Sequence, residues 1–225
     1  MAKETKAGRM KVVLATALLF APALLLIIIS TRGCEHKFKV LDDYGKMKRY
    51  AFTDARGKKY TSDDFKDKIV LITTLQPSCP GKCEISFWHL KKHIYETVYT
   101  NKKKLGDVRI ISFVTDGNGN PVEDISQVAL MVKDQVKDYN PDTWIIASGS
   151  SKELYDIEHN KQNLLTVGEE DFGGENGFQK LMLLIDKKNH LRMALSGENE
   201  GMVRRMKEHV ALLMKQYDKE AAKKK

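Results

Sequence analysis

The stretch that decides the fold runs from Ile69 to Cys83 and reads IVLITTLQPSCPGKC. Its first part, residues 69–75, is a continuous run rich in β-branched side chains, which is typical of a strand buried on both faces of a parallel sheet. A loop over residues 76–80 follows, and a helical pattern then extends to about Tyr99. The stretch therefore predicts a buried strand that leads into a helix, with two cysteines at the junction.

Cys79 and Cys83 lie at the predicted start of that helix. Backbone N–H groups at a helix N-terminus are unpaired and the helix dipole is positive there, so a thiolate is stabilised. Cysteines four positions apart on a helix have Cα atoms about 6 Å apart, which permits a disulfide. When reduced, the two soft sulfurs suit Cu(I). The pair is a candidate for dithiol–disulfide exchange, for copper binding, or for a disulfide that only staples one turn.

The rest of the chain alternates between strand and helix patterns. Strands are expected at residues 50–61 (a hairpin), 108–114, 144–147 and 179–194 (a second hairpin). Helices are expected at residues 123–139, after Ser150, and at residues 201–217. This order gives parallel strands first and an antiparallel hairpin last. It predicts a thioredoxin-like α/β fold, in which helices flank a central mixed sheet.

An apolar run from Val12 to Ile29 follows a basic N-terminus. About 18 helical residues at 1.5 Å each reach about 27 Å, close to the hydrocarbon thickness of a bilayer. The run predicts an uncleaved single-pass anchor in the cell membrane, with the N-terminus cytoplasmic and the remaining chain on the periplasmic or extracytoplasmic side. Gly33 and Cys34 faintly resemble a lipoprotein cleavage site, but Arg32 fits that pattern poorly.

Length and composition fit one domain with an anchor. The 225 residues divide into a cytoplasmic basic tail (1–11), a transmembrane anchor (12–30), a tether (31–48), a thioredoxin-like domain (49–217) and a basic C-terminal tail (218–225). Three cysteines are too few for a disulfide framework, so an apolar core must hold the domain. The net charge of +8 comes largely from short lysine clusters and not from a basic helix with interleaved aromatics. We therefore expect no nucleic-acid partner.

Several segments resemble the Sco/SenC family over about residues 50–212. They are CPGKC at 79–83, ISFVTD at 111–116, WIIASG at 144–149 and LLID at 183–186. The resemblance implies a membrane-anchored thioredoxin-like domain outside the cytoplasm, with Cys79 and Cys83 as redox-active residues and metal ligands. It also implies Cu(I) handling or thiol reduction during assembly of the copper site of cytochrome c oxidase. The implied partner is the copper subunit of the oxidase or another thiol protein.

One position departs from the family pattern. The family places a histidine shortly before the strand that matches residues 181–185, and Phe178 stands there in this chain. His190 lies across the hairpin turn, which places it about 23 Å away. Glu175 and Asn176 lie in the right loop, but oxygen ligands suit Cu(I) poorly. The family's three-ligand site is therefore not expected, and a site made of two thiolates remains.

His89 and His93 are one helical turn apart and form a second candidate metal pair. They lie about 9 and 15 Å along the helix beyond Cys83, too far to join the sulfurs. No third ligand is evident from the sequence, and Lys91 and Lys92 indicate a solvated face. We therefore expect no metal site at this pair.

The sequence also allows comparison with three functions other than a Sco-like one. A general exported thiol–disulfide reductase usually has two residues between its cysteines and a cis-proline opposite, whereas here three residues intervene and no proline precedes the strand at 181–185. A peroxide reductase needs a threonine just before its cysteine, and Pro77 and Ser78 stand there. A non-catalytic binding module on a thioredoxin fold stays open, because Phe178 replaces the family histidine.

Overall fold

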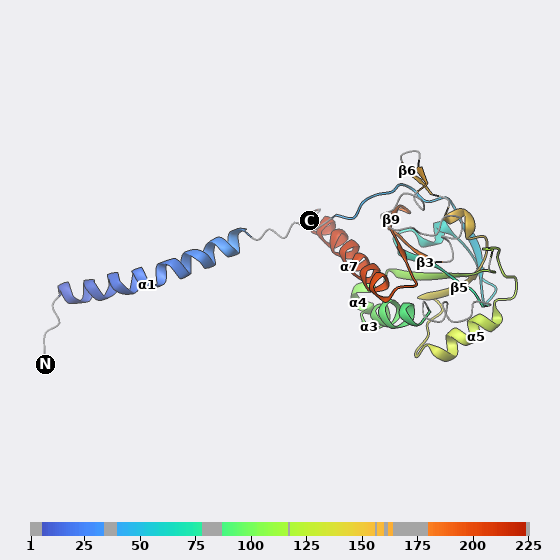
Figure 1. Ribbon diagram of the computed structural model, residues 1–225, viewed down its shortest axis with the longest axis horizontal. Coiled ribbons are helices and arrows are strands. Elements are labelled where there is room, and N and C mark those ends of the chain that lie inside the picture. The colour runs from blue at the N-terminus through green and yellow to red at the C-terminus, as the bar shows by residue number, and fades with distance from the viewer. Residues whose placement is uncertain are drawn as a thin grey trace. The chain divides into compact units, whose positions relative to one another are not determined.

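The chain forms two compact units, Met1–Lys39 and Val40–Lys225. The computed structural model describes residues 6–33, 40–77, 87–116, 118–155, 157–159, 162–163 and 180–223. The described part of the first unit is one helix, α1 (Lys6–Gly33), with Pro22 inside it (Figure 1). Within the described ranges, no helix combines the length and the apolarity needed to cross a membrane. The anchor expected at residues 12–30 stays a prediction.

A seven-stranded mixed sheet lies at the centre of the second unit, in the order β2-β1-β5-β4-β3-β8-β9 (Figure 1). Its strands are β1 (Ala51–Asp54), β2 (Lys59–Thr61), β3 (Ile69–Leu75), β4 (Val108–Val114), β5 (Trp144–Ser148), β8 (Leu181–Ile185) and β9 (Leu191–Ser196). Strands β3, β4 and β5 are parallel, whereas β8 is antiparallel to β3 and β9 is antiparallel to β8. The expected mixed α/β sheet with its hairpin last in the chain is confirmed. A separate two-stranded sheet joins β6 (Glu158–His159) to β7 (Gln162–Asn163).

Alternate residues of the strands bury the two faces of the sheet in separate apolar cores. In β3, Ile69 and Leu71 face one core, while Val70 and Ile72 face the other. The first core packs against η2 (Leu90–Tyr95, a π-helical segment), α3 (Glu96–Thr100), α5 (Ser126–Gln135) and α7 (Glu200–Lys223). Figure 1 shows α3, α7 and the short α4 (Lys102–Leu105) close together.

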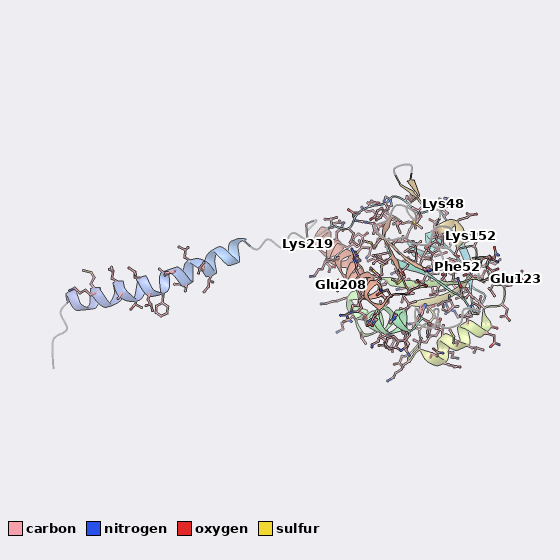
Figure 2. All side chains as sticks on the ribbon, viewed as in Figure 1. Lys48, Phe52, Glu123, Lys152, Glu208 and Lys219 are labelled. Carbon is pink, nitrogen blue, oxygen red and sulfur yellow. The ribbon has the colours of Figure 1, made fainter. Side chains whose placement is uncertain are left out.

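In the described part of the chain, short segments cover the opposite face of the sheet. These are η1 (Ser62–Phe65), η3 (Lys152–Leu154) and the chain that leads into β1. Phe52 lies within this core, with its ring 5.2 Å from that of Tyr60 and 5.5 Å from that of Phe113. Figure 2 shows Phe52 inside the domain and Glu208 on the exposed side of α7. The helix expected after Ser150 is therefore only a short 3₁₀ turn, η3.

The folded unit begins before the expected boundary at residue 49 and ends after the one at residue 217. Leu41 and Met47, within the expected tether, are buried. The Arg192 guanidinium donates a hydrogen bond to the Leu41 carbonyl oxygen at 2.6 Å, which attaches this segment to β9. At the other end, α7 continues to Lys223.

Strands β3, β4, β5 and β9 end at the same edge of the sheet. Because β8 is antiparallel to both β3 and β9, the strand β9 runs in the same direction as β3, β4 and β5. We call the edge where these four strands end the carboxyl edge; it includes Gln76, Thr115, Ser151 and Glu200. We call the opposite edge, where they begin, the amino edge; it includes Lys68, Asp107, Lys187 and Arg192.

Candidate functional site

The expected redox pair, Cys79 and Cys83, lies outside the described residues, as does Cys34. The structure describes the two elements that hold the cysteine segment. On one side β3 ends at Leu75, at the carboxyl edge, and on the other side the chain is helical again at Phe87. The segment therefore connects the end of a central strand to a helix that covers the first core. A strand before the segment and a helix after it agree with the sequence, whereas the predicted start of the helix at the cysteines lies outside the described residues.

The helix after the cysteine segment is fixed to the sheet by an aromatic contact. Phe87 is buried, and its ring stacks 5.5 Å from that of Trp144 on β5. The Trp144 indole Nε1 donates a hydrogen bond to Ser112 Oγ at 2.9 Å, and that hydroxyl lies 2.7 Å from the Thr73 hydroxyl. This chain of contacts crosses β5, β4 and β3. The first described residue of this helix therefore packs on a set of contacts that spans three strands.

A small cleft opens beside the point where the chain leaves β3. It is lined by residues of β3, of the following helix and of the β8–β9 hairpin, among them Thr74, Leu75, Leu90, Lys180, Met182 and Gly197. The Gly197 N–H donates to the Lys180 carbonyl oxygen at 2.6 Å. A Cβ on Gly197 would meet that oxygen at 3.3 Å and Met182 Cγ at 3.4 Å, so a side chain there would crowd the cleft.

Of the residues considered as the third copper ligand, the structure describes only His190. Phe178, Glu175 and Asn176 lie outside the described residues. His190 lies at the amino edge, where its Nδ1 is 2.9 Å from a carboxylate oxygen of Asp43. It thus lies beyond the far end of β8, as its position across the hairpin turn predicts.

His89 and His93 do not occupy the solvated face expected from their lysine neighbours. The His93 side chain is only 12% exposed, and its Nε2 lies 3.0 Å from Glu200 Oε1 on α7. Lys91 is also partly buried, and its ammonium donates to the Gln135 carbonyl oxygen at 2.6 Å. The sequence reasoning missed Glu200, because no pattern in the sequence places the first residue of α7 beside this helix. Burial lowers the pKa of His93, while the Glu200 charge opposes this effect.

Several buried polar atoms near the carboxyl edge have no hydrogen-bond partner in the described part of the chain. They are Gln76 Nε2, His89 Nδ1, Thr115 Oγ1 and Ser151 Oγ. Three of these residues follow the ends of β3, β4 and β5, and His89 lies on the helix after β3. An unpaired buried polar group costs about 1–3 kcal/mol. Such groups are tolerated where they serve a ligand or a reaction.

No protein-family model and no curated protein sequence matches this chain. Solved structures do match. BsSco, described as a Sco-family cytochrome c oxidase assembly protein with a disulfide switch, superposes with a TM-score of 0.56 at 15% identity, over 78% of this chain and 98% of that one. A SCO1/SenC family lipoprotein from Bacillus anthracis superposes with a TM-score of 0.54 at 16% identity, over 75% of this chain and 94% of that one.

A third match is named as a putative protein disulfide isomerase from Bacteroides thetaiotaomicron. It gives a TM-score of 0.50 at 16% identity, over 78% of this chain and 92% of that one. At these identities the likeness concerns the fold. The structural neighbours of this chain include Sco/SenC family proteins, and it shares their fold, as the resemblance of its segments predicts.

Proposed function

We propose that this chain is a Sco-like protein in which Cys79 and Cys83 perform thiol–disulfide exchange, Cu(I) transfer or both, in the assembly of the copper site of cytochrome c oxidase. The observation that carries the proposal is the place of the cysteine segment in the chain. It connects the end of β3, at the carboxyl edge, to the helix that contains Phe87. In open α/β sheets, ligands bind outside the carboxyl ends of the strands.

The proposed exchange reaction needs both cysteines. One thiolate attacks a sulfur of the partner's disulfide, and a mixed disulfide forms as the partner's other sulfur leaves as a thiolate. The second cysteine then attacks the mixed disulfide and releases the partner in its dithiol form. Two electrons pass to the partner, and the cysteine pair ends as a disulfide. For copper, the same two sulfurs bind Cu(I) after losing their protons.

A copper titration combined with a thiol assay tests the proposal. We expect the reduced full chain to bind one Cu(I), and Cys79→Ser or Cys83→Ser to abolish this binding. Cys34→Ser, outside the CPGKC segment, is the matched control and should bind one Cu(I) as the unsubstituted chain does. Redox activity of the pair without copper binding would support the thiol–disulfide reductase alternative. The absence of both activities would overturn the proposal in favour of a non-catalytic binding module.

Phe178 allows a sharper test of the copper site. If residue 178 occupies the place of the family histidine, Phe178→His adds a third ligand to the two thiolates. We expect Cu(I) affinity to rise at least tenfold, which corresponds to about 1.4 kcal/mol. Phe178→Ala is the matched control, because it removes the same ring without adding a ligand. An equal affinity in both variants would place residue 178 away from the metal.

Membrane attachment through the N-terminal segment is part of the same proposal. Its support is the apolar run from Val12 to Ile29 and the basic residues before it. We expect the full chain to be recovered with membranes after cell breakage and high-salt washing. A chain lacking residues 1–39, which form a separate unit, should remain in the supernatant. Recovery of both chains in the supernatant would contradict the attachment.

A further inference from the structure

A cluster of three metal-ligating side chains lies at the carboxyl edge and is separate in sequence from the two cysteines. His89 and His93 come from the helix after β3, and Glu200 is the first residue of α7. One potential ligand atom from each residue lies within 4.8 Å of the other two. The shortest separation is 3.0 Å, between His93 Nε2 and Glu200 Oε1.

The spacing of these atoms suits a small divalent ion. Zinc binds histidine nitrogens and carboxylate oxygens at about 2.0–2.2 Å, so two ligands of a tetrahedral site are about 3.3 Å apart. The observed separations extend from 3.0 Å to at most 4.8 Å. Modest side-chain rotations therefore suffice to close the cluster around an ion, since every ligand is already on the same side of the sheet.

Both histidines have a buried nitrogen that an ion could use. His89 Nδ1 has no hydrogen-bond partner among the described residues, and His93 Nε2 lies 3.0 Å from the Glu200 carboxylate. Glu200 is about half exposed, with 48% of its side chain accessible, so an ion can reach the cluster from solvent. A bound metal would give a buried nitrogen the partner that it lacks.

The elements that carry the cluster are held by packing. The two imidazole rings stack 6.0 Å apart, and the Trp88 ring approaches His89 edge-on at 5.4 Å. Lys92 Nζ lies 4.3 Å above the Trp88 ring, which directs that positive charge to the indole. Val203, one turn after Glu200, is fully buried in the first core. The ligands are therefore presented by two helices that already pack on the same core.

We propose that His89, His93 and Glu200 bind one divalent transition-metal ion, Zn²⁺, with a water molecule as the fourth ligand. Two histidines and one glutamate are a ligand set that zinc uses where a coordination position stays open. The bound ion would link the helix after the cysteine segment to the first turn of α7. Because none of its ligands is a cysteine, the site is independent of the proposed Cu(I) chemistry.

A zinc titration of a cysteine-free full chain tests the site. Replacing Cys34, Cys79 and Cys83 with Ser removes every thiol that competes for zinc. We expect this chain to bind one Zn²⁺ by calorimetry, and Co²⁺ in its place to give the intense visible absorption of a tetrahedral site. Glu200→Gln should weaken Zn²⁺ binding at least tenfold, and His93→Gln should weaken it further.

Matched controls separate loss of a ligand from loss of the fold. Glu220→Gln changes another glutamate of α7, whose carboxylate accepts a hydrogen bond from Gln216, and it should leave Zn²⁺ affinity unchanged. His190→Gln changes a histidine at the amino edge and should also have no effect. Circular dichroism checks that each variant is folded. Absence of Zn²⁺ binding in the folded cysteine-free chain, or binding that survives both Glu200→Gln and His93→Gln, would overturn the proposal.

Discussion

The amino and carboxyl edges of the sheet differ in how their polar groups are satisfied. At the amino edge the ionised groups are paired: Asp107 lies 2.8 Å from both Lys68 Nζ and Lys187 Nζ, and Arg192 lies 3.0 Å from Asp186. Asp186 also accepts hydrogen bonds from two backbone N–H groups of the β8–β9 turn. At the carboxyl edge, by contrast, buried polar atoms of Gln76, Thr115 and Ser151 lack partners in the described part of the chain.

This difference indicates that the amino edge serves mainly stability and the carboxyl edge mainly function. Breaking a buried ion pair at the amino edge leaves an uncompensated charge and destabilises the fold, whereas a buried polar group without a partner at the carboxyl edge raises the free energy of the folded state. Proteins commonly accept such a cost at a functional site. The cysteine segment and the histidine cluster both lie at or beside the carboxyl edge. Substitutions at the two edges should therefore change stability in opposite directions.

The largest effect is expected for Arg192→Met at the amino edge. The Arg192 and Asp186 side chains are only 8% and 2% exposed, and removal of the cation leaves a buried carboxylate without its counter-ion. We expect the free energy of unfolding in urea to fall by about 3–5 kcal/mol. Lys180→Met is the control, because its pair with Glu198 is longer, at 3.3 Å, and much more exposed. Equal losses of unfolding free energy in the two variants would show that the amino edge contributes no more to stability than the carboxyl edge.

A change of opposite sign is expected for Thr115→Val at the carboxyl edge. The Thr115 hydroxyl is fully buried and has no hydrogen-bond partner among the described residues, and valine has nearly the same shape. We expect the free energy of unfolding to rise by about 1 kcal/mol. Thr73→Val is the matched control, since its hydroxyl bonds to Ser112 at 2.7 Å; this variant should lose about 1 kcal/mol. Destabilisation by Thr115→Val would mean that its hydroxyl has a partner after all.

The smallest effect is expected for Asp107→Asn, and it depends on pH. Hydrogen bonds from Lys187 and then Lys68 lower the pKa of Asp107 to about 2. Because the folded pKa is below that of the unfolded chain, the carboxylate stabilises the fold above about pH 4, and this contribution is lost as the pH falls towards 2. Its side chain is 42% exposed, so solvent screening limits the loss at pH 7 to about 1 kcal/mol or less.

Urea unfolding of Asp107→Asn and the unsubstituted chain between pH 2 and pH 7 measures this contribution. The difference in the free energy of unfolding between the two chains should become smaller only below about pH 4. High salt should reduce this difference at pH 7. A difference that stays constant over the whole pH range would assign the effect to packing and not to charge.

The strands and their order along the chain can be predicted from the sequence, because the signals for each strand are local. The β-branched run at residues 69–75 and the similar run at 108–114 predict two buried strands, and the structure pairs them in parallel. The hairpin at the end of the sheet follows from two apolar runs around a polar turn. The helix after Ser150 was overestimated, since capping signals there lead only to a 3₁₀ turn. Local patterns therefore established the sheet but not the length of each helix.

Contacts between distant segments could not be predicted from the sequence. Residues 40–48 show no periodicity, yet Leu41 is buried and its carbonyl oxygen accepts a hydrogen bond from Arg192. Glu200 likewise lies beside His93 only because the helix after β3 and α7 pack on the same face of the sheet. Such pairings depend on the packing of helices on the finished sheet. No single pattern in either segment encodes them.

The attachment of the segment after Val40 to β9 also determines where a mechanical load enters the domain. Tension applied through residues before Val40 would be resisted first by the Arg192 hydrogen bonds to Leu41 and Asp42 and by the backbone bond from Tyr44 to Leu191. All of these contacts lie at the amino edge. The force would therefore reach the sheet through β9, at the edge opposite the one where β3 ends.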